Sequence, residues 1–588
     1  MNVGERQRKL SLWAEQLRAD RNLPLFSRRE DHRLYDLYHL VYEPTWLRAA
    51  HDRVARNSGS ITAGCDGVNM AQFDERLEDN LRQLADELRN QTFRPHPVRR
   101  VYIPKTGGRM RPLGIPSIRD RIVQESLRMV LEPVFEGEFY NHSFGFRPNR
   151  STKDALAVVT YSAGTRPRYY WVVEGDIAAC FDTIHHRKLM GLLRRRIRDD
   201  KLLLLVWRFL RAGVMEGKLF KDTVRGTPQG GIISLLLANV YLHELDMFME
   251  RRTGLSPDEK KRRRLRGLGN FVHVRYADDF VVMTNGTREE AEAMRSELQQ
   301  FLTDELKLSL SMEKTRITHI DDGFRFLGFD IRRHMTGCGV KLPKLLIPRD
   351  SVRKVRATVL AITALSSCNQ SVNAKIVALN HLLRGWANHY HNAYNAARVF
   401  YKLDSFVFWQ FAHWLAEKFK CRLSQVLRRH YRHAGGVKTL ASADKALWRM
   451  RTLKCELLRQ RTFVNPYSSP NPALERANEF GTAPQWLGNE TRPGIEDLRF
   501  AVHRRDNWFC RNCGCKVSEA TAKLDHVRGV QTFTRPEDAN VENNLQTLCV
   551  LCHKHKTQTE IDRWMESPVQ RKLHAGFGGG SAETCPDG

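Results

Sequence analysis

The stretch "RYADDFVV", Arg275–Val282, places two adjacent carboxylates, Asp278 and Asp279, between runs of β-branched and aromatic residues. The runs "FVHVRY" before the pair and "FVVMT" after it predict two strands joined by a short connection that contains the carboxylates. Neighbouring like charges repel and lose hydration unless a cation binds them. The stretch therefore favours a metal-binding hairpin, although an Asp-Asp pair is also ordinary turn chemistry.

A further carboxylate, Asp176, ends a strand-like run in "YYWVVEGDIAACFDTI". An unpaired carboxylate in a buried strand would be costly, so Asp176 favours the metal interpretation over the simple turn. Nucleotidyl transfer uses two Mg²⁺ ions roughly 3.5–4 Å apart, and carboxylates from neighbouring strands can hold such a pair. Mg²⁺ prefers oxygen ligands and is normally shared between carboxylates and substrate phosphates.

The length of the chain indicates its number of domains, and its net charge indicates the kind of partner it binds. A chain of 588 residues predicts three to five domains at about 100–200 residues each. The formal net charge of +29 indicates a polyanionic partner, above all nucleic acid. No apolar run approaches the roughly 20 residues of a membrane span, and "MNVGERQRKL" lacks the apolar core of a secretion signal. We therefore expect no membrane association and a cytoplasmic location, in a bacterial cytoplasm or nucleoid or in an organelle matrix.

The character of the sequence changes along the chain. The first ninety or so residues predict helices, and "VRRVYIPKTGGRMRPLGIP" predicts two strands around a Gly-Gly turn. Mixed α/β sequence runs to about Arg333, and a helical pattern follows from Arg349 to about Leu458. Phe463–Gly494 is rich in proline and predicts a linker. The run "KKRRRLR", residues 260–266, is expected in a loop, either as a solvated charged segment or as a phosphate contact.

Several motifs in a fixed order identify a family resemblance. "YADD", "GDIAACFDTI" and "RGTPQGGIISLLLANVYLHELD" resemble the reverse transcriptases encoded within group II introns. "PKTGGRMRPLGIPSIRDRIVQ", "SFGFRPNRST", "LSMEKTRIT" and "FRFLGFDIRR" extend the resemblance over most of the chain. The family pattern has proline after "GGIIS", whereas Leu235 stands here, and we expect a local packing change at this position.

The resemblance implies roles for individual residues of the polymerase. Asp176 and Asp278 would bind two Mg²⁺ ions, and Asp279 would support the site. Lys105 and Arg111 of the Gly-Gly hairpin would bind the nucleotide triphosphate, with Arg109 a weaker candidate. Gln229 would lie near the templating base pair. Lys314 would protonate the leaving pyrophosphate.

Phe181 lies five residues after Asp176. By resemblance it is the steric gate, an aromatic ring that occupies the space of a ribose 2′-hydroxyl. RNA-synthesising relatives have a polar residue there that accepts the hydroxyl. Without its surrounding motif, a core phenylalanine would be the better interpretation.

The C-terminal module contains two CxxC pairs, with the spacing of a tetrahedral Cys₄ zinc site. They are Cys510 with Cys513 and Cys549 with Cys552, and Cys515 is a spare that could replace one ligand. So small a module has little core and would depend on the metal to fold.

"KLDHVRGV" and "NNLQTLCVLCHKHKT" resemble an HNH endonuclease, a ββα-metal fold. In that resemblance His526 is the general base, Asn544 orients it, and Asp525 and His553 bind a catalytic divalent ion. Asn543 is an alternative to Asn544, and His555 is an alternative to His553. A zinc ribbon that only binds DNA is the alternative to an HNH module.

The combined prediction is a multidomain α/β and α protein: a right-hand polymerase, a helical thumb and maturase domain, and an HNH module. The expected domains are a helical extension (1–90), fingers and palm (91–335), thumb and maturase (336–460), a linker or DNA-binding region (461–497), the HNH endonuclease (498–560) and a disordered tail (561–588).

The expected function is RNA-directed DNA polymerase and intron maturase. The protein would assist splicing of its group II intron RNA, nick target DNA and reverse-transcribe the intron during retrohoming. Deoxynucleoside triphosphates, intron RNA and target DNA are the expected partners, and a homodimer is compatible with the sequence. A splicing factor with an idle polymerase and a reverse transcriptase used outside introns are the alternatives. The intact polymerase residues disfavour the first, and the maturase-like region joined to an HNH module disfavours the second.

Overall fold

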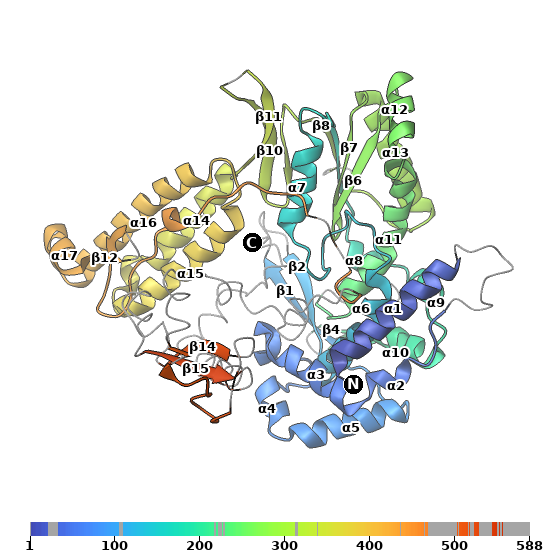
Figure 1. Cartoon of the computed structure of the whole chain (residues 1–588), viewed down its shortest axis with the longest axis horizontal. Coiled ribbons are helices and arrows are strands. Elements are labelled where there is room, and N and C mark those ends of the chain that lie inside the picture. Colours follow the sequence, from blue (N-terminus) through green and yellow to red (C-terminus); the bar gives the residue numbers. More distant parts are fainter. Residues whose placement is uncertain are drawn as a thin grey trace. The chain divides into compact units, whose positions relative to one another are not determined.

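Figure 1 shows the protein, a computed structural model of the 588-residue chain. The described residues are 2–21, 33–104, 110–216, 219–221, 226, 230–311, 315–337, 339–434, 437–461, 463, 465–468, 502–503, 505–515, 517, 522–527, 544–549, 552 and 556. They belong to two compact units. One comprises Met1–Lys344 and the segment that begins at Leu458, and the other comprises Leu345–Leu457 and the cysteine-bearing module within Pro484–Gly579.

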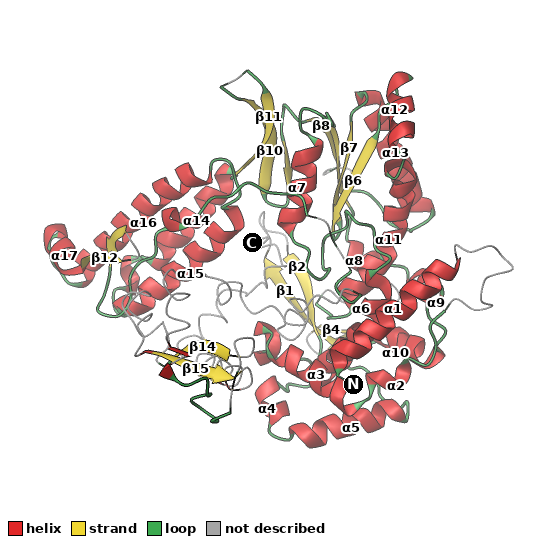
Figure 2. Cartoon of the chain, viewed as in Figure 1, coloured by secondary structure: helices red, strands yellow, loops and turns green. Residues whose placement is uncertain are grey.

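The first unit contains an antiparallel sheet with strand order β6-β7-β3-β8 (Figure 2). Its strands are β3 (Trp171–Asp176), β6 (Phe271–Tyr276), β7 (Asp279–Thr284) and β8 (Arg316–His319). Side chains on both faces of β7 are buried from Phe280 to Thr284, which is why this strand is a continuous apolar run. Helices α7 (Thr152–Ser162), α11 (Ser234–Thr253) and α13 (Arg288–Asp304) contact these strands. The hairpin predicted around Asp278 is confirmed.

A second sheet in the same unit has strand order β2-β1-β4-β5. Strands β1 (Val98–Pro104) and β2 (Met110–Ile115) pair antiparallel, from Arg99 opposite Ile115 to Pro104 opposite Met110. This confirms the predicted hairpin, whose Gly-Gly turn lies outside the described residues. The remaining strands are β4 (Val214–Glu216) and β5 (Leu219–Lys221).

Helix α6 (Ile118–Glu136) is buried along almost its whole length. Ser117 caps it by accepting a hydrogen bond from the backbone N–H of Asp120 at 3.3 Å. Helices α1 and α3 pack against it, and the indole of Trp46, which is fully buried, donates to the carbonyl of Ser126. The N-terminal region is helical as predicted: α1 (Val3–Arg21), α2 (Tyr38–Val41), α3 (Pro44–Ala55), α4 (Met70–Asp74) and α5 (Leu77–Arg89).

Shorter elements complete this unit. They are α8 (Cys180–Thr183), α9 (His186–Arg194), α10 (Asp200–Leu210), and a three-stranded sheet of β9 (Phe324–Phe326), β10 (Phe329–Met335) and β11 (Lys341–Leu346). Strands therefore continue beyond Arg333, where the mixed α/β sequence was expected to end. The extra strand contains "KLPKLL", whose proline is compatible with an edge position.

The basic run after α11 forms a helix, α12 (Pro257–Leu265), and the expectation of a loop is wrong. Ser256 and Glu259 form a capping box, and Pro257 occupies the first helical turn. These are strong helix-start signals, and they outweigh the repulsion between neighbouring cations that favoured a loop.

The second unit contains the helices predicted from Arg349 onward. They are α14 (Arg349–Ile362), α15 (Val372–Tyr390), α16 (Ala396–Lys418) and α17 (Leu423–His430). The helical pattern was expected to continue to about Leu458, but it ends at His430. A hairpin of β12 (Tyr431–Ala434) and β13 (Val437–Leu440) follows, consistent with the Gly-Gly between these strands in the sequence.

After this hairpin the chain is held by the buried carboxylate of Asp404 in α16. It accepts hydrogen bonds from the backbone N–H groups of Met450 at 2.8 Å and Arg451 at 3.0 Å. These bonds fix the segment, which forms a short 3-10 helix at Met450–Thr452, on the helices, so local sequence alone does not predict its path.

The described residues of Leu458–Ser468, here called the return segment, lie against the first unit. Arg461 donates to both carboxylate oxygens of Asp154, at 2.7 and 2.8 Å. Phe463 lies beneath the guanidinium of Arg150, 4.4 Å from its ring centroid. This segment was expected to begin a linker, and as far as Ser468 that expectation is wrong. Prolines suggested a linker, while the aromatic residues between them supply the apolar surface that holds the segment in place.

Two further contacts fix the end of the return segment. Asn465 donates to Ser11 and Glu15 of α1, at 2.9 and 2.8 Å. Tyr467 is only 5% exposed, and its hydroxyl donates to the carboxylate of Glu132 in α6 at 2.6 Å. Burial and the negative charge of Glu132 raise the pKa of Tyr467 well above its usual value. Its hydroxyl therefore keeps its proton and remains a donor at neutral pH.

Among the helices of the described residues, none combines the length and the apolarity that crossing a membrane requires.

We expect Tyr467→Ala to loosen α6, because it removes a buried ring and leaves Glu132 with one partner fewer. Truncation of a buried aromatic residue costs about 3–5 kcal/mol. Hydrogen–deuterium exchange of the α6 amides should become faster by two or more orders of magnitude. Tyr161→Ala is the matched control, because that ring is 62% exposed. Equal protection of α6 in both variants would show that the return segment does not stabilise this unit.

Candidate polymerase and nuclease sites

The structure brings the predicted polymerase carboxylates together. Strands β3 and β7 pair antiparallel, and their register places Asp176 directly opposite Asp279. Asp278 is the second residue of the two-residue turn between β6 and β7, because Tyr276 pairs with Asp279. Directly opposed residues have Cβ atoms about 4.5–5.5 Å apart, so the strand pairing sets Asp176 beside Asp279, with Asp278 in the adjoining turn.

The electrostatics nearby reflect this concentration of negative charge. Burial, together with the charges of Asp278 and Asp176, raises the pKa of the Cys180 thiol far above its usual value. The thiol is therefore protonated at neutral pH. A nearby cation would lower the free energy of the carboxylates, and divalent ions fit an all-oxygen set of this kind.

Arg275, the cation closest in sequence to the carboxylate pair, interacts with a different acid. It is fully buried, and its guanidinium donates to both carboxylate oxygens of Asp246 in α11, at 2.7 and 2.6 Å. His273 contacts the same carboxylate at 3.1 Å. Burial would raise the pKa of Asp246, but Arg275 and His273 hold it well below its usual range. Asp246 is therefore ionised at neutral pH and forms a buried ion pair.

The remaining donors of Arg275 hold the turn itself. One terminal nitrogen donates to the carbonyl of Ala277 at 2.9 Å and to the side-chain oxygen of Asn239 at 3.0 Å. Ala277 has a φ of +56°, in the left-handed region that non-glycine residues rarely adopt. The hydrogen bond from Arg275 thus fixes the strained residue immediately before Asp278.

A second support for the turn comes from Gly145, in the segment "SFGFRPNRST". Asn239 donates to the carbonyl of Gly145 at 2.9 Å, and a side chain at Gly145 would clash with the backbone nitrogen of Ala277. Only glycine permits so close an approach. Asp246, Asn239 and Gly145 were not identified from the sequence. A signal was available in "LANVYLHELD", where Asn239 and Asp246 lie seven residues apart, on one face of a helix.

Phe181 lies in α8, is 6% exposed and makes an edge contact with Phe146, with ring centroids 6.5 Å apart. Gly230 has a φ of +112°, and a side chain there would clash with the carbonyl of Gly114 in β2. The backbone at Gly230 therefore approaches β2 closely. Leu235 is the second residue of α11 and packs against the core.

The other predicted contacts are only partly described. Arg111 lies in β2 opposite Ile103. Four candidates fall outside the described residues, namely Lys105, Arg109, Gln229 and Lys314. The strand-like start of the "LSMEK" motif is described: the N–H of Ser311 donates to the carbonyl of Asp176 at 2.8 Å. The described start of that motif therefore lies beside the end of β3.

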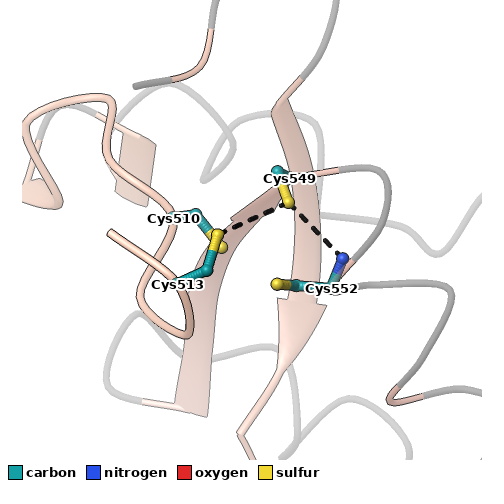
Figure 3. Close-up of side chains that lie close together, drawn as sticks. All are labelled: Cys510, Cys513, Cys549 and Cys552. Carbon is teal, nitrogen blue, oxygen red and sulfur yellow. Dashed lines mark hydrogen bonds between the residues drawn. The ribbon is translucent and has the colours of Figure 1, made fainter. Parts of the chain in front are cut away.

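The four predicted cysteines form one cluster (Figure 3). Their sulfur atoms all lie within 4.8 Å of one another, with Cys513 and Cys549 3.8 Å apart. A tetrahedral site with Zn–S bonds of about 2.3 Å implies sulfur separations of about 3.8 Å. Cys515 lies 3.4 Å from Cys513, so the alternative of a ligand exchange stays open.

Backbone N–H groups surround this cluster. Burial raises the pKa of Cys510, but hydrogen bonds from the backbone of Cys513, Cys549 and Asn512 lower it to about 6. The backbone N–H of Cys552 lies 3.4 Å from the sulfur of Cys549 and lowers the pKa of that thiol. Such donors stabilise thiolates, the form that binds metal ions.

The two CxxC pairs accompany an antiparallel hairpin of β14 (Ala522–His526) and β15 (Leu545–Cys549). His526 ends β14 opposite Leu545, and the N–H of Val527 donates to the carbonyl of Asn544 at 2.7 Å. The predicted base and the residue predicted to orient it therefore come from adjacent strand ends. His553 lies outside the described residues.

The carboxylate of Asp525 has two cationic or polar neighbours. Lys556 lies 2.6 Å and the amide of Gln546 3.4 Å from it. A divalent ion at Asp525 would take the place of the Lys556 ammonium.

Three family models match successive parts of the chain. The family model for reverse transcriptase (RNA-dependent DNA polymerase) matches residues 103–331, that for the group II intron maturase-specific domain matches 352–435, and that for HNH endonuclease matches 510–559. Among solved structures, the partial Cas6-RT-Cas1–Cas2 complex matches with a TM-score of 0.29 and 20% identity, over 50% of this chain and 45% of that one.

The chain aligns with two curated relatives over nearly the whole length of each relative. Protein YkfC of Escherichia coli is 40% identical over 383 residues, 62% of this chain and 97% of YkfC. The group II intron-encoded protein LtrA of Lactococcus lactis is 31% identical over 594 residues, 88% of this chain and 95% of LtrA. The chain belongs to the group II intron-encoded proteins, with reverse transcriptase, maturase and HNH endonuclease regions in one polypeptide.

Proposed function

We propose that Asp176 and Asp278 hold two Mg²⁺ ions for DNA synthesis on an RNA template, and that Asp279 supports the same site. The observation behind this proposal is the register that sets Asp176 opposite Asp279, with Asp278 in the adjoining turn. When bound, such a pair of ions activates the attacking 3′-hydroxyl and neutralises the leaving pyrophosphate. Carboxylate oxygens are the ligands Mg²⁺ prefers.

Other residues of the first unit act on the nucleotide. Lys105 and Arg111 of the β1–β2 hairpin bind the triphosphate, Gln229 lies beside the templating pair, and Lys314 gives a proton to the pyrophosphate. Phe181 excludes ribonucleotides. Its location in α8, five residues beyond the end of β3, supports this assignment.

We assign the two sheets of residues 91–335 to the fingers and palm of a right-hand polymerase, and residues 336–460 to the thumb and maturase region. The maturase region binds the intron RNA and assists splicing. Its surface supports this role, because Tyr394, Tyr401 and Trp409 are exposed there, and single-stranded bases stack on aromatic rings.

The cysteine cluster holds a structural Zn²⁺ through Cys510, Cys513, Cys549 and Cys552. In the HNH module His526 takes a proton from the attacking water, Asn544 orients His526, and Asp525 and His553 bind a divalent ion. The module nicks the DNA strand opposite the intron insertion, and the polymerase copies the intron RNA from the new 3′ end.

Asp278→Ala should lower extension of a DNA primer on an RNA template by about 10³-fold or more, because several kcal/mol of charge stabilisation depend on the bound ions. Assisted splicing should persist, since the RNA performs that chemistry. Asp322→Ala removes an exposed carboxylate of the same unit and serves as the control. Full polymerase activity in the Asp278 variant would refute the carboxylate assignment.

Arg275→Lys should lower kcat for primer extension by about 10²-fold, with little change in KM. Lysine keeps the charge beside Asp246 but cannot also hold the carbonyl of Ala277, and a displacement of 1 Å at a reacting centre costs about 10²-fold. Single-turnover kinetics would separate the two parameters. Arg316→Lys, on the exposed side of β8, is the matched control. An unchanged kcat would show that Arg275 contributes to the stability of the fold and does not position the turn.

His526→Ala should lower nicking of the target DNA by about 10²–10⁴-fold, the usual contribution of a general base, and should leave zinc content unchanged. Cys549→Ser should lose both zinc and nicking, because so small a module depends on the metal for folding. Metal analysis and a nicking assay distinguish the two variants, and primer extension should remain near wild type in both. Normal nicking by the His526 variant would leave a module that only binds DNA.

A further inference from the structure

Helix α12 (Pro257–Leu265) buries none of its side chains. Isolated helices of nine residues are unstable in water, so a short helix normally depends on packing of an apolar face. Here the stabilisation comes from the capping box of Ser256 and Glu259 and from contacts with the following segment. The exposed side of the helix therefore contributes little to the fold.

Contacts at one side of α12 attach it to the sheet. The guanidinium of Arg263 donates twice to the carbonyl of Gly269, at 2.8 and 3.1 Å, and the amide of Asn270 donates to the carbonyl of Lys260 at 3.1 Å. The N–H of Gly269 in turn donates to Glu290, in the first turn of α13, at 2.9 Å. The helix is thus held in one orientation at the start of β6.

Four cations of this region remain exposed: Lys261, Arg262, Arg264 and Arg266. None of them forms a salt bridge with a carboxylate of the described residues. At about 100° per residue, Lys261 lies roughly opposite Arg263 and Arg262 and Arg264 lie about 100° to either side of it. Arg266, the C-cap, lies about 60° from Arg263. The exposed charges therefore surround the side of the helix that Arg263 attaches to the following segment.

Repulsion between these cations lowers the stability of the helix. Like charges three or four positions apart, such as Lys261 with Arg264 and Arg262 with Arg266, cost about 0.2–0.5 kcal/mol per pair. The helix dipole favours cations in the last turn, but only by about 0.3–1 kcal/mol at an exposed site. A polyanion on this face would relieve the repulsion and release counterions on binding.

The position of α12 indicates which nucleic acid it meets. The helix precedes Phe271 at the start of β6, whereas the carboxylates follow Tyr276 at its other end. These ends are roughly 17 Å apart along the strand. Figure 1 shows α12 beside α13, at the end of the β6–β7 hairpin away from the turn. The exposed cations therefore do not contact the reacting nucleotide.

We propose that α12 is a phosphate-binding helix that contacts the folded intron RNA outside the polymerase site. This inference rests on the proposed function in taking intron RNA as the partner. The planar guanidinium of arginine can donate two hydrogen bonds to the oxygens of one phosphate. A helix that is already fixed in one orientation loses little entropy on binding. The surface lacks the wide apolar stripe that a membrane-binding helix requires.

The test is a full-length variant with Lys261, Arg262, Arg264 and Arg266 all changed to Gln. Affinity for the intron RNA at 0.15 M salt should fall by about 10–100-fold, and the slope of log K against log salt should become shallower by about 1 per lost contact. KM for a short RNA template–DNA primer should stay at the wild-type value. Melting temperature checks that the fold is intact.

The control removes the same number of charges elsewhere on this unit, by changing Arg76, Arg82, Arg89 and Lys201 to Gln. These side chains are exposed on or beside α5 and α10. Equal RNA affinities and salt slopes for the two quadruple variants would overturn the proposal. A parallel rise in KM for the primer–template would instead assign α12 to the path of the copied duplex, and would also overturn it. If the wild-type chain itself failed to bind intron RNA, the proposed function would fail rather than the role of α12.

Discussion

Antiparallel pairing of β3 with β7 is the constraint on which the polymerase site depends. It sets Asp176 opposite Asp279 and leaves Asp278 in the adjoining turn. Their mutual repulsion opposes this geometry until cations bind. The surrounding structure must therefore hold the strand ends in place, and the continuous burial of β7 provides most of that support.

The ion pair of Arg275 and Asp246 supplies the rest of the support for the strand ends. A buried ion pair contributes little net stability, because the cost of removing both charges from water offsets their attraction. Its value lies in orientation, since the guanidinium is fixed by Asp246 and directs another donor to the carbonyl of Ala277. Removing either partner would leave an uncompensated charge in the core, which makes the arrangement all-or-none. The strained turn is thus held by a group that does not touch the carboxylates.

Much of this could be predicted from the sequence. The hairpin around Asp278, the strand ending at Asp176 and the cysteine cluster follow from local patterns of two to six residues, which strand and metal-ligand geometry impose directly. The pairing of β3 with β7 joins residues about a hundred positions apart, and only the family resemblance pointed to it. The contact of Gly145 with Ala277 is of the same long-range kind, because it depends on close approach rather than on a pattern. At α12 the capping signals of Ser256, Pro257 and Glu259 were present in the sequence, although the run was expected in a loop.

The return segment has a consequence for how the protein is made. The chain leaves the first unit after Lys344 and comes back to it at Leu458, so the maturase helices are an insertion in the polymerase rather than an appendage. A ribosome synthesises residues in order, and domains generally fold as units as they emerge. The contacts of Arg461, Asn465 and Tyr467 with α7, α1 and α6 can form only after the maturase helices have been translated. A nascent chain therefore completes its first unit after those helices have emerged and before the cysteine-bearing module has been made.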